Sequence, residues 1–543
     1  MKIIKSFRTA KMLTLTGAAF AAALMLAAAP ASAAEPIALP IVKQPMTLTY
    51  WAPMNPQATT TLKSYADMEA YKVLAEKTGI SLSFTHPPQG AELERMNLMV
   101  TSGKYPDVIE YDWFRYPGGP SKALSDKVIV PLNDLIKQYA PNLQAILDQH
   151  PEVRREISTE EGVIYAFPLL RLDPIVRTFW GPQVRADWLA KVGLKAPTTI
   201  DEWHTVLTAF KTHNLNGHAS NDIIPYSAYQ VAGNEKSAPG LPPGLWPFLS
   251  AYGLAPEFYQ VNGKVHYSPA EPAYKDFLAT MQRWYREGLI DPDYTSQQST
   301  AFDAKVLNNR VGAYAGYNGG HLGRFTNLAK GSIDGFRLAA VEFPAGAGGK
   351  RYTTWPTANQ IYSGYGAAIS AQDHHVIETV KFLDFGYSKE GGRALNFGRE
   401  GVSYTMVQGK PHFTDSVLKN PKLSIAEAIL RNARPQGGPL VQDPEYFIQF
   451  YPLPWQKAAL GTWSTSSNDL LLPPITVSPA DSRAFNAKMA EINTYVAEMT
   501  TKFILGREPM DKFDAYRASL DKLGVREAIG MMQASLDRYN AKK

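Results

Sequence analysis

The sequence contains no cysteine among its 543 residues. This absence excludes disulfide bonds, a thiolate nucleophile and a zinc site with cysteine ligands. Runs of one charge are lacking too: 55 Lys and Arg side chains stand against 50 Asp and Glu, a net charge of +5. An excess this small, without a long basic run, gives no support for a nucleic-acid partner.

Long hydrophobic runs are also missing, except for one near the N-terminus. Four basic residues within Lys2–Lys11 precede the apolar run Leu13–Ala29, and the small residues Ala31–Ala33 resemble a processing site. This pattern predicts a signal peptide over residues 1–33, with the mature chain beginning near Ala34. We therefore expect export into a periplasm, or to the cell exterior where there is no outer membrane.

The familiar motifs of hydrolases and metalloenzymes are absent. The sequence has no G-x-S-x-G and no H-E-x-x-H, and His374 and His375 are adjacent, so they do not face one metal as an i, i+4 pair would. The Gly-rich stretch Phe343–Tyr352 lacks the spacing of a phosphate loop, and we expect a hairpin there. No cofactor is expected. A glycoside hydrolase needs only two carboxylates, so a secreted carbohydrate-active enzyme remains the alternative to a binding protein.

The composition is that of a soluble globular protein, with 45% hydrophobic and 19% charged residues. A chain of this length exceeds what one hydrophobic core normally organises. We expect at least two lobes.

The N-terminal part alternates between strand and helix patterns. Strands are predicted at Thr47–Trp51, Ile80–Phe84 and Asp107–Tyr111, with helices at Asp67–Lys77 and Glu92–Thr101 between them. This alternation is typical of a mostly parallel α/β sheet. Ligands of such sheets bind beyond the carboxyl ends of the strands, where Trp51 and Trp113 lie. Local packing is an equally good interpretation of either ring alone.

Residues 160–190 are interpreted as the place where the chain leaves one lobe and enters another. Val163–Phe167 alternates as a strand that Pro168 ends, and Val176–Trp180 is apolar again. A helix then opens at Arg185 and closes at Gly193. Tyr165 and Trp180 flank this bend and are candidate ligand contacts.

The second lobe is predicted from several helix and turn signals. Thr199 and Glu202 form a capping box ahead of a buried stripe that ends at Phe210. Asn262-Gly263 predicts a hairpin, and the helix from Pro272 places Trp284 in the core. Val311–Tyr317 predicts a buried strand that runs into a loop at Asn318.

Aromatic and amide side chains gather in three further stretches. These are the Pro/Gly-rich loop with Trp246, the segment Trp355–Tyr365 ahead of a strand at Gly366–Ser370, and Phe447–Trp463. Rings stack on the flat apolar faces of sugars while amides bond the hydroxyls. The combination favours a saccharide ligand.

Several stretches resemble family 1 extracellular solute-binding proteins of ABC importers. They include GVIYAFP, VRADWLAKVGLKAPTTIDEW, SGKYPDVIEYDW, MQRWYREGLIDPDY and KFLDFGYSKEGGRALNFGREGVSY, followed by closing helices such as FDAYRASLDKLGVREAIGMMQASLDRYN. The resemblance covers nearly the whole mature chain. It implies a bilobal fold of two α/β lobes joined by a multi-strand hinge around a ligand cleft.

The resemblance also implies an organisation and a function. The N-terminal lobe is expected to comprise 34–168 plus about 366–435, and the C-terminal lobe 169–365 plus about 436–543. The protein is expected to capture an oligosaccharide and deliver it, as a monomer, to ABC permease subunits. The family includes lipoproteins and alginate-oligosaccharide-binding members, so an acidic sugar is one possibility. The lipoproteins carry a cysteine at the cleavage point, which this chain lacks.

The resemblance contributes to the candidate site as well. Tyr165, Asn318 and Gln360 match, by position, places that contribute to the cleft of the alginate-binding members, although Asn318 replaces an aromatic residue. The full set of ligand-binding candidates is Trp51, Trp113, Tyr165, Trp180, Trp246, Asn318, Gln360, Tyr362, Tyr365 and Trp455.

The last expectation concerns calcium. Several relatives carry an EF-hand-like loop after the helix that Phe210 ends, because a hard cation needs several converging oxygens. The corresponding positions here are Asn214, Asn216, His218, Ser220 and Asp222, and Ile223 replaces the final Glu. Only Asp222 keeps a carboxylate, so we expect a polar turn and no metal.

Overall fold

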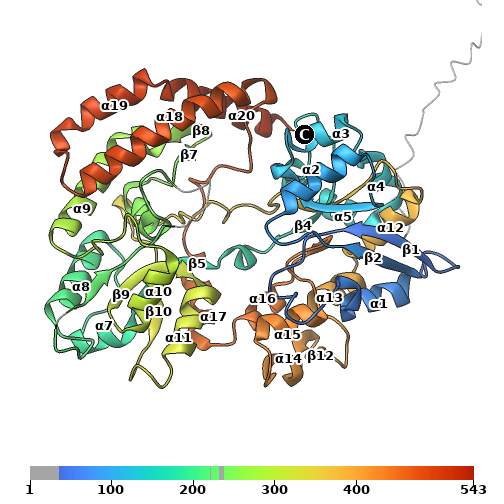
Figure 1. Cartoon of the computed structure of the whole chain (residues 1–543), viewed down its shortest axis with the longest axis horizontal. Coiled ribbons are helices and arrows are strands. Elements are labelled where there is room, and N and C mark those ends of the chain that lie inside the picture. Colours follow the sequence, from blue (N-terminus) through green and yellow to red (C-terminus); the bar gives the residue numbers. More distant parts are fainter. Residues whose placement is uncertain (1–35, 221, 231–237, 543) are drawn as a thin grey trace, which may run out of the picture.

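The computed structural model describes residues 36–220, 222–230 and 238–542. The predicted signal peptide, residues 1–33, lies outside the described residues. Two bodies, each with its own sheet and its own buried core, make up the molecule (Figure 1). The bilobal α/β fold expected from the sequence is confirmed.

The first lobe is built on a six-stranded sheet in the order β14-β4-β11-β3-β1-β2. β11 is antiparallel to both of its neighbours, whereas β1 pairs in parallel with β2 and β3, and β14 with β4. The predicted, mostly parallel sheet is thus present. The strands are β1 (Met46–Trp51), β2 (Ile80–Thr85), β3 (Val108–Asp112), β4 (Phe167–Leu170), β11 (Tyr365–Ile369) and β14 (Leu440–Val441).

The helices of this lobe begin and end near the predicted residues. α1 (Glu69–Thr78) and α2 (Glu92–Ser102) stop at Gly79 and Gly103, whose φ angles of 78° and 64° suit glycine. The other helices are α3 (Gly119–Ser125), α4 (Asn133–Tyr139), α5 (Pro141–Gln149), α6 (Pro151–Glu156), α12 (Val376–Phe385) and α13 (Lys389–Phe397).

A smaller helical unit extends the first lobe. It contains the hairpin β12 (Tyr404–Val407) and β13 (Lys410–Phe413) with α14 (Asp415–Leu418), α15 (Ile425–Asn432) and α16 (Pro444–Phe450). Its core places Tyr446 and Phe447 with Phe397 of α13. Residues 440–450 therefore belong to the first lobe.

The second lobe has a four-stranded sheet in the order β10-β5-β9-β6. β5 is antiparallel to β9 and β10, while β6 is parallel to β9. The strands are β5 (Trp180–Arg185), β6 (Ile224–Tyr226), β9 (Val311–Tyr317) and β10 (Leu338–Ala340). The helices around them are α7 (Ala186–Val192), α8 (Ile200–Thr212), α9 (Pro272–Arg286), α10 (Ser299–Leu307), α11 (Arg324–Ala329) and α17 (Pro454–Ser464).

Local signals in this lobe are largely confirmed. Trp203 on α8 and Trp284 on α9 are fully buried, and Asn262-Gly263 joins β7 (Phe258–Val261) to β8 (Lys264–Tyr267). The capping box is only half formed: Thr199 Oγ1 accepts from the Glu202 amide at 3.3 Å, but the Glu202 carboxylate accepts from the Thr198 amide at 2.7 Å. Thr198 supplies a second donor through its hydroxyl, which draws the carboxylate away.

Two expected boundaries are wrong. Pro168 lies inside β4 and pairs with Gly366, so the strand starts near the point where we expected it to end. Proline is tolerated there because the ladder does not require a donor at that position. The final crossing to the second lobe is not near residue 436 but follows α16, because β14 pairs with β4 of the first lobe. The sequence of β14 is only two residues long and carries no strand pattern of its own.

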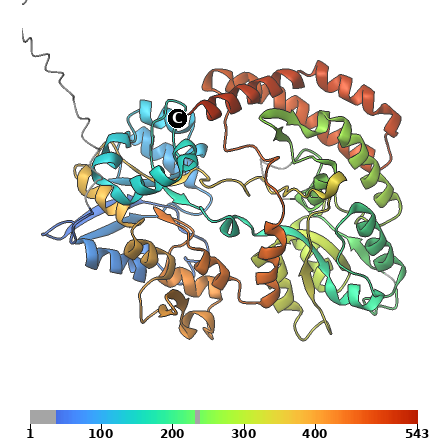
Figure 2. The same cartoon turned by 180° about the vertical axis from the view of Figure 1, so that it is seen from behind.

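The last three helices, α18 (Pro479–Ile504), α19 (Phe513–Lys522) and α20 (Val525–Ala541), lie along the second lobe (Figures 1 and 2). The end of α20 reaches across to the first lobe. Lys542 Nζ donates to the Ser158 carbonyl at 2.8 Å, and Arg538 pairs with Glu160 at 2.9 Å. None of the helices in the described part of the chain is both long and apolar enough for a membrane span.

Candidate functional site

A pocket of about 160 Å³ opens on the first lobe at the carboxyl ends of its strands. Pro53, Met54 and Asn55 follow β1, and Tyr365 begins the antiparallel β11, so all four lie at the same edge of the sheet. The remaining lining comes from Tyr65 and from the segment around Arg434, Gln436 and Gly437. This is the first-lobe pocket.

The charge beneath the first-lobe pocket is internally neutralised. Arg434 is 2% exposed and bonds both Glu110 oxygens through its two Nη atoms, at 2.7 and 2.8 Å. Glu110 also accepts from Tyr50 Oη at 2.7 Å and from the Gly438 amide at 2.9 Å. Burial and the Glu110 carboxylate raise the pKa of Tyr50, which keeps the phenol a hydrogen-bond donor. Arg434 therefore presents little net charge to a ligand.

A second pocket, of about 190 Å³, opens on the second lobe where β5 begins. We call it the second-lobe pocket. Its walls combine rings, small hydroxyl side chains, one amide and one guanidinium, which belong to Pro174, Arg177, Thr178, Trp180, Thr353, Trp355, Ala358, Trp463, Ser464, Ser466, Ser467 and Asn468.

The rings of the second-lobe pocket are held by one another. Trp355 stacks on Trp180 with centroids 5.0 Å apart and planes at 29°. Trp246 backs both rings at 6.2–6.4 Å, and Tyr317 meets Trp355 edge-on at 5.4 Å. Trp180 and Trp246 are almost fully buried, whereas Trp355 is partly exposed and Tyr317 is 39% exposed. Trp355 and Tyr317 therefore offer the accessible ring surface.

Two chain crossings run between the pockets and bond each other. The Arg171 amide, directly after β4, donates to the Ile361 carbonyl at 3.0 Å. Arg177 Nη1 donates to the Asn359 carbonyl at 3.2 Å. The backbone around residues 171–177 and 359–361 thus forms a paired hinge, as the resemblance implied.

Glu156 lies beside this hinge in a third pocket of about 300 Å³, which also contains Tyr165 and Lys542. One of its oxygens accepts from the Tyr362 amide at 2.8 Å. Burial raises the pKa of Glu156 to about 7, although the backbone amides and Arg177 act in the opposite direction.

The candidate residues from the sequence divide between pocket and core. Trp180 and Tyr365 line the two pockets. Trp51, Trp113 and Trp246 are at most 4% exposed and pack in the cores, and Trp113 Nε1 donates to the Gly366 carbonyl. Trp51 and Trp113 do follow strand ends as predicted, whereas Trp246, expected in a loop, lies in the 3-10 helix Pro243–Tyr252; all three rings are buried in the lobes.

Tyr165 and Tyr362 form a buried pair with centroids 6.4 Å apart, near the hinge. Tyr362 Oη donates to the Gly364 carbonyl at 2.8 Å. The hydroxyl of Tyr165 is buried without a partner within the described residues, yet Tyr165 lines the third pocket. Gln360 is partly exposed and belongs to the hinge segment 359–361.

Asn318 and Trp455 lie at the contact of β9 with α17. Asn318 is fully buried and exchanges two hydrogen bonds with Gln456, at 2.9 and 3.0 Å. Trp455 is partly buried against the second core. Asn318 thus ties the strand end to the helix, and the neighbouring Tyr317 is the exposed side chain.

Several pocket residues were not among the candidates. Trp355 and Trp463 lay within stretches noted for their aromatic content, so their composition was a usable signal. Tyr317 looked like the end of a buried strand. The polar pocket residues Asn55, Gln436 and Arg177 had no sequence signal, because long-range packing alone brings them to the pockets.

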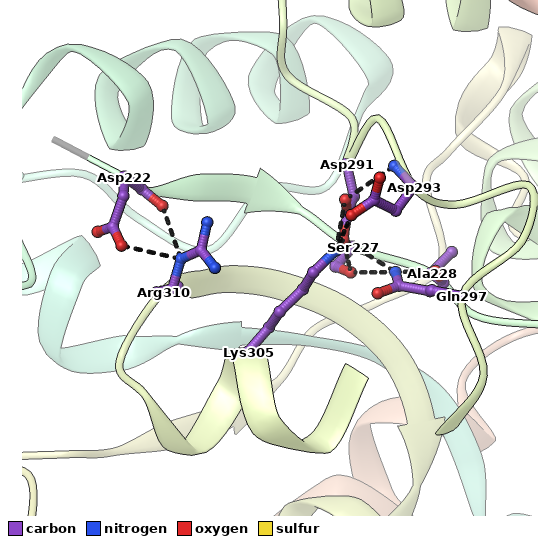
Figure 3. Close-up of polar contacts among 8 residues, drawn as sticks. All are labelled: Asp222, Ser227, Ala228, Asp291, Asp293, Gln297, Lys305 and Arg310. Carbon is purple, nitrogen blue, oxygen red and sulfur yellow. Dashed lines mark hydrogen bonds and ion pairs between the residues drawn. The ribbon is translucent and has the colours of Figure 1, made fainter. Parts of the chain in front are cut away.

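The polar turn after α8 is held by its own side chains and by a distant arginine, Arg310, whose contact with Asp222 is drawn in Figure 3. One Asp222 oxygen accepts from Asn216 Nδ2 at 2.7 Å and contacts His218 Nδ1 at 2.8 Å. The other pairs with Arg310 Nε at 2.9 Å. Asn214 Nδ2 donates to the His218 carbonyl at 2.9 Å. Ser220 lies at the exposed rim of the turn.

A second polar cluster in Figure 3 supports β6 and α10. Asp291 is 1% exposed and accepts from Lys305 Nζ, Ser227 Oγ and Gln297 Nε2 at 2.6–2.9 Å. Lys305 also pairs with Asp293. No cluster of three or more His, Asp or Glu side chains able to hold a metal occurs in the described part of the chain.

Two lobes, a hinge with several crossings and a pocket on each facing edge define a protein of the bilobal ligand-binding class. Residues 55–393 match the family described as bacterial extracellular solute-binding protein. The chain belongs to this family.

Curated relatives and solved structures agree with this assignment. The chain is 25% identical over 494 residues to the fructooligosaccharide ABC transporter substrate-binding protein FusA of Streptococcus pneumoniae, covering 87% of both chains. It is 25% identical to lipoprotein LipO of Bacillus subtilis, covering 82% of this chain and 84% of LipO. Among solved structures, the alginate-binding protein AlgQ2 without calcium ion has 27% identity and a TM-score of 0.64, covering 91% of this chain and 99% of that one. FusA in complex with kestose, at 22% identity, has a similar fold with a TM-score of 0.67 over 92% of this chain and all of the other.

Proposed function

We propose that this protein is the substrate-binding component of an ABC importer and captures an oligosaccharide between its lobes. The observation that carries the proposal is the second-lobe pocket, where a stacked Trp355 stands among hydroxyl and amide side chains. The names of the relatives agree, since FusA is a fructooligosaccharide-binding protein and AlgQ2 binds alginate.

The chemistry of the two pockets suits a sugar. The accessible faces of Trp355 and Tyr317 offer stacking surface, and Thr178 and Ser467 offer hydroxyl groups. Across the hinge, Asn55 and Gln436 add amides that can donate and accept. Gln360, a partly exposed residue of the hinge segment 359–361, adds a further amide. A chain of several sugar units is long enough to touch both.

The mode of action follows from the hinge. The paired crossings allow the lobes to move as rigid bodies, and a ligand that contacts both pockets stabilises the closed arrangement by its differential affinity. We infer export by the predicted signal peptide into a periplasm or the cell exterior, action as a monomer, and delivery of the sugar unchanged to permease subunits. No catalytic role is assigned to any residue.

The test is a calorimetric and thermal-shift screen of the mature protein against neutral and acidic oligosaccharides. We expect at least one to bind with micromolar or tighter affinity and to compact the protein in solution scattering. Trp355→Ala should weaken that binding. The control is Trp203→Phe, which changes a buried ring in the core of the second lobe and should leave the affinity unchanged. Absence of binding across the screen would contradict the proposal, and conversion of the bound sugar, followed by mass spectrometry, would favour a hydrolase.

A further inference from the structure

The buried arginines of this protein normally face carboxylates. Arg434 pairs with Glu110, and Arg185, 1% exposed, pairs with Asp187 at 2.6 Å. Both arrangements follow the rule that a guanidinium removed from water needs a compensating anion. Arg171 departs from this rule.

The side chain of Arg171 has no hydrogen bond and no ion pair within the described part of the chain, and only its backbone amide is bonded. It is partly exposed, yet burial lowers the pKa of its guanidinium, and the positive charge of Arg177 lowers it further. A group that touches solvent but is surrounded by protein lies in a crevice. Within the described residues, no carboxylate is among the groups that influence this pKa.

Arg177 is nearly as poorly compensated. Its Nη atoms donate to the backbone carbonyls of Asn359 and Leu172 at 3.2 and 3.4 Å, while its Nε is buried without a partner among residues 36–220, 222–230 and 238–542. Glu156 and Asp173 influence it electrostatically, but neither forms an ion pair with it. Because the pKa of Glu156 is raised to about 7, that carboxyl carries only part of its charge at neutral pH.

The two arginines stand between the two pockets. Arg177 lines the second-lobe pocket. Arg171 directly follows β4 and is close enough to Tyr446 to influence its pKa. The Tyr446 hydroxyl accepts from Gln436 Nε2 at 2.9 Å, and Gln436 lines the first-lobe pocket. A sugar chain that spans the pockets therefore passes these side chains at the hinge.

We propose that Arg171 and Arg177 form an anion subsite at the hinge, which binds a negatively charged group carried by one unit of the oligosaccharide. This inference rests on the proposed function and specifies its substrate class: an acidic saccharide with a carboxylate or a sulfate ester. The planar guanidinium of Arg171 is suited to a bidentate contact with either group. Arg177, partly held by carbonyls, contributes charge and one further donor.

The experiment compares acids with matched neutral sugars. Trigalacturonate and an alginate trisaccharide are each titrated beside their methyl esters, which keep length, linkage and stereochemistry. A sulfated carrageenan oligosaccharide separates sulfate from carboxylate, and inorganic sulfate measures binding of a free anion. We expect an acid in this set to bind about 10- to 100-fold more tightly than its neutral counterpart, the range for a charge-assisted bidentate contact.

The variants are Arg171→Gln, Arg171→Lys and Arg177→Gln, with Arg431→Gln as the control. Arg431 is exposed on α15, so the control removes one positive charge outside the hinge. Arg171→Gln should abolish the preference for the acid while leaving the affinity for neutral sugars within about twofold. Arg171→Lys should retain part of the preference, because it keeps the charge without the planar fork.

The melting temperature of the free protein gives a second measurement. Removal of an uncompensated charge should leave Arg171→Gln at least as stable as the wild type. A lower melting temperature, together with equal loss of acidic and neutral binding, would make Arg171 a structural residue and overturn the inference. Tight binding of neutral sugars without preference for acids would also overturn it, but would leave the proposed function intact. If only inorganic sulfate binds, the site holds an adventitious ion only, and the inference is overturned. If no saccharide binds, both the anion subsite and the proposed function are refuted.

Discussion

The two lobes treat the groups at their facing edges in opposite ways. In the first-lobe pocket a full positive charge is present but is cancelled on site, since Arg434 is bonded to Glu110, which is itself saturated by Tyr50 and Gly438. In the second-lobe pocket the walls are rings and hydroxyl groups. Among the described residues, Arg177 is bonded only to carbonyls and the side chain of the nearby Arg171 has no bonded partner. In the first-lobe pocket the charges are therefore paired before a ligand binds. In the second-lobe pocket and at the hinge, the guanidinium groups lack a paired anion.

The difference indicates a division of labour. Pre-satisfied polar groups give a rigid wall that contributes shape and a few hydrogen bonds. Unsatisfied donors and open ring faces gain contacts only when a ligand is present, so they favour the closed arrangement. Glu156 lies beside the hinge and is buried like Glu110, but within the described residues no cationic side chain is bonded to it.

The largest expected effect on stability comes from disrupting the ion pair between Glu110 and Arg434 beneath the first-lobe pocket. Glu110→Gln leaves Arg434 buried without an anion, and we expect a loss of roughly 3–5 kcal/mol in the free energy of unfolding. The measurement is the midpoint of urea denaturation. The double variant Glu110→Gln with Arg434→Met removes both charges and should recover most of the loss. If Glu110→Gln is as stable as the wild type, the charge pairing at the first-lobe pocket does not stabilise the fold, and the contrast with the second-lobe pocket fails.

The next effect concerns Glu156 and pH. Its pKa is about 7 in the folded protein, above the usual value of about 4.3 in an unfolded chain. Between these values the folded state holds a proton that the unfolded state has lost, so stability falls as pH rises through this window and is level above it. Glu156→Gln should abolish the decline and exceed the wild type at pH 8 by on the order of 3 kcal/mol.

The check is a series of melting curves from pH 4 to pH 8. The two proteins should converge at the acid end, where the wild-type carboxyl is protonated in both states. Arg177 and Glu152 are the charged groups that influence Glu156, and both remain in the variant. Parallel curves over the whole range would contradict the raised pKa.

The second-lobe pocket is tested by removal of its partly exposed ring, Trp355. Trp355→Ala should weaken oligosaccharide binding by about 1–3 kcal/mol, the range for loss of a stacked ring and its buried apolar area. Trp355→Phe keeps a ring on Trp180 and should lose much less. Titration calorimetry measures both. Equal affinity in all three proteins would place the sugar away from the second-lobe pocket.

The smallest effect is expected at the polar turn, far from both edges. Asp222 is already paired with Arg310 and contacted by His218 and Asn216, so it offers little negative charge to a hard cation. We expect the melting temperature of the wild type to change by less than about 1 °C on addition of millimolar calcium or chelator. A marked rise with calcium and fall with chelator would refute this. Arg310→Met, which frees one carboxylate oxygen, is the variant in which a calcium response is most to be expected.

Local patterns along the chain determined the elements and the class of fold. The alternation of strands with helices before residue 112, the glycine stops at Gly79 and Gly193, and the buried stripes with Trp203 and Trp284 were all readable, because each depends on the periodicity of a single segment. The resemblance in the quoted stretches added the family and the two lobes. Aromatic content also pointed to the segment with Trp355.

Only the tertiary structure decided which side chains face the cleft. Trp113 and Trp355 both lie in aromatic-rich segments, but Trp113 is fully buried and donates to Gly366 of β11, whereas Trp355 stacks on Trp180 and is partly exposed. Likewise Arg434 and Arg171 are similar in sequence terms, each near the end of a first-lobe segment, yet Glu110 compensates only Arg434. Whether a buried charge is paired, and whether a ring is exposed, depends on residues far away in the sequence. Arg434 and Glu110, for example, are 324 residues apart, so no local pattern encodes their pairing.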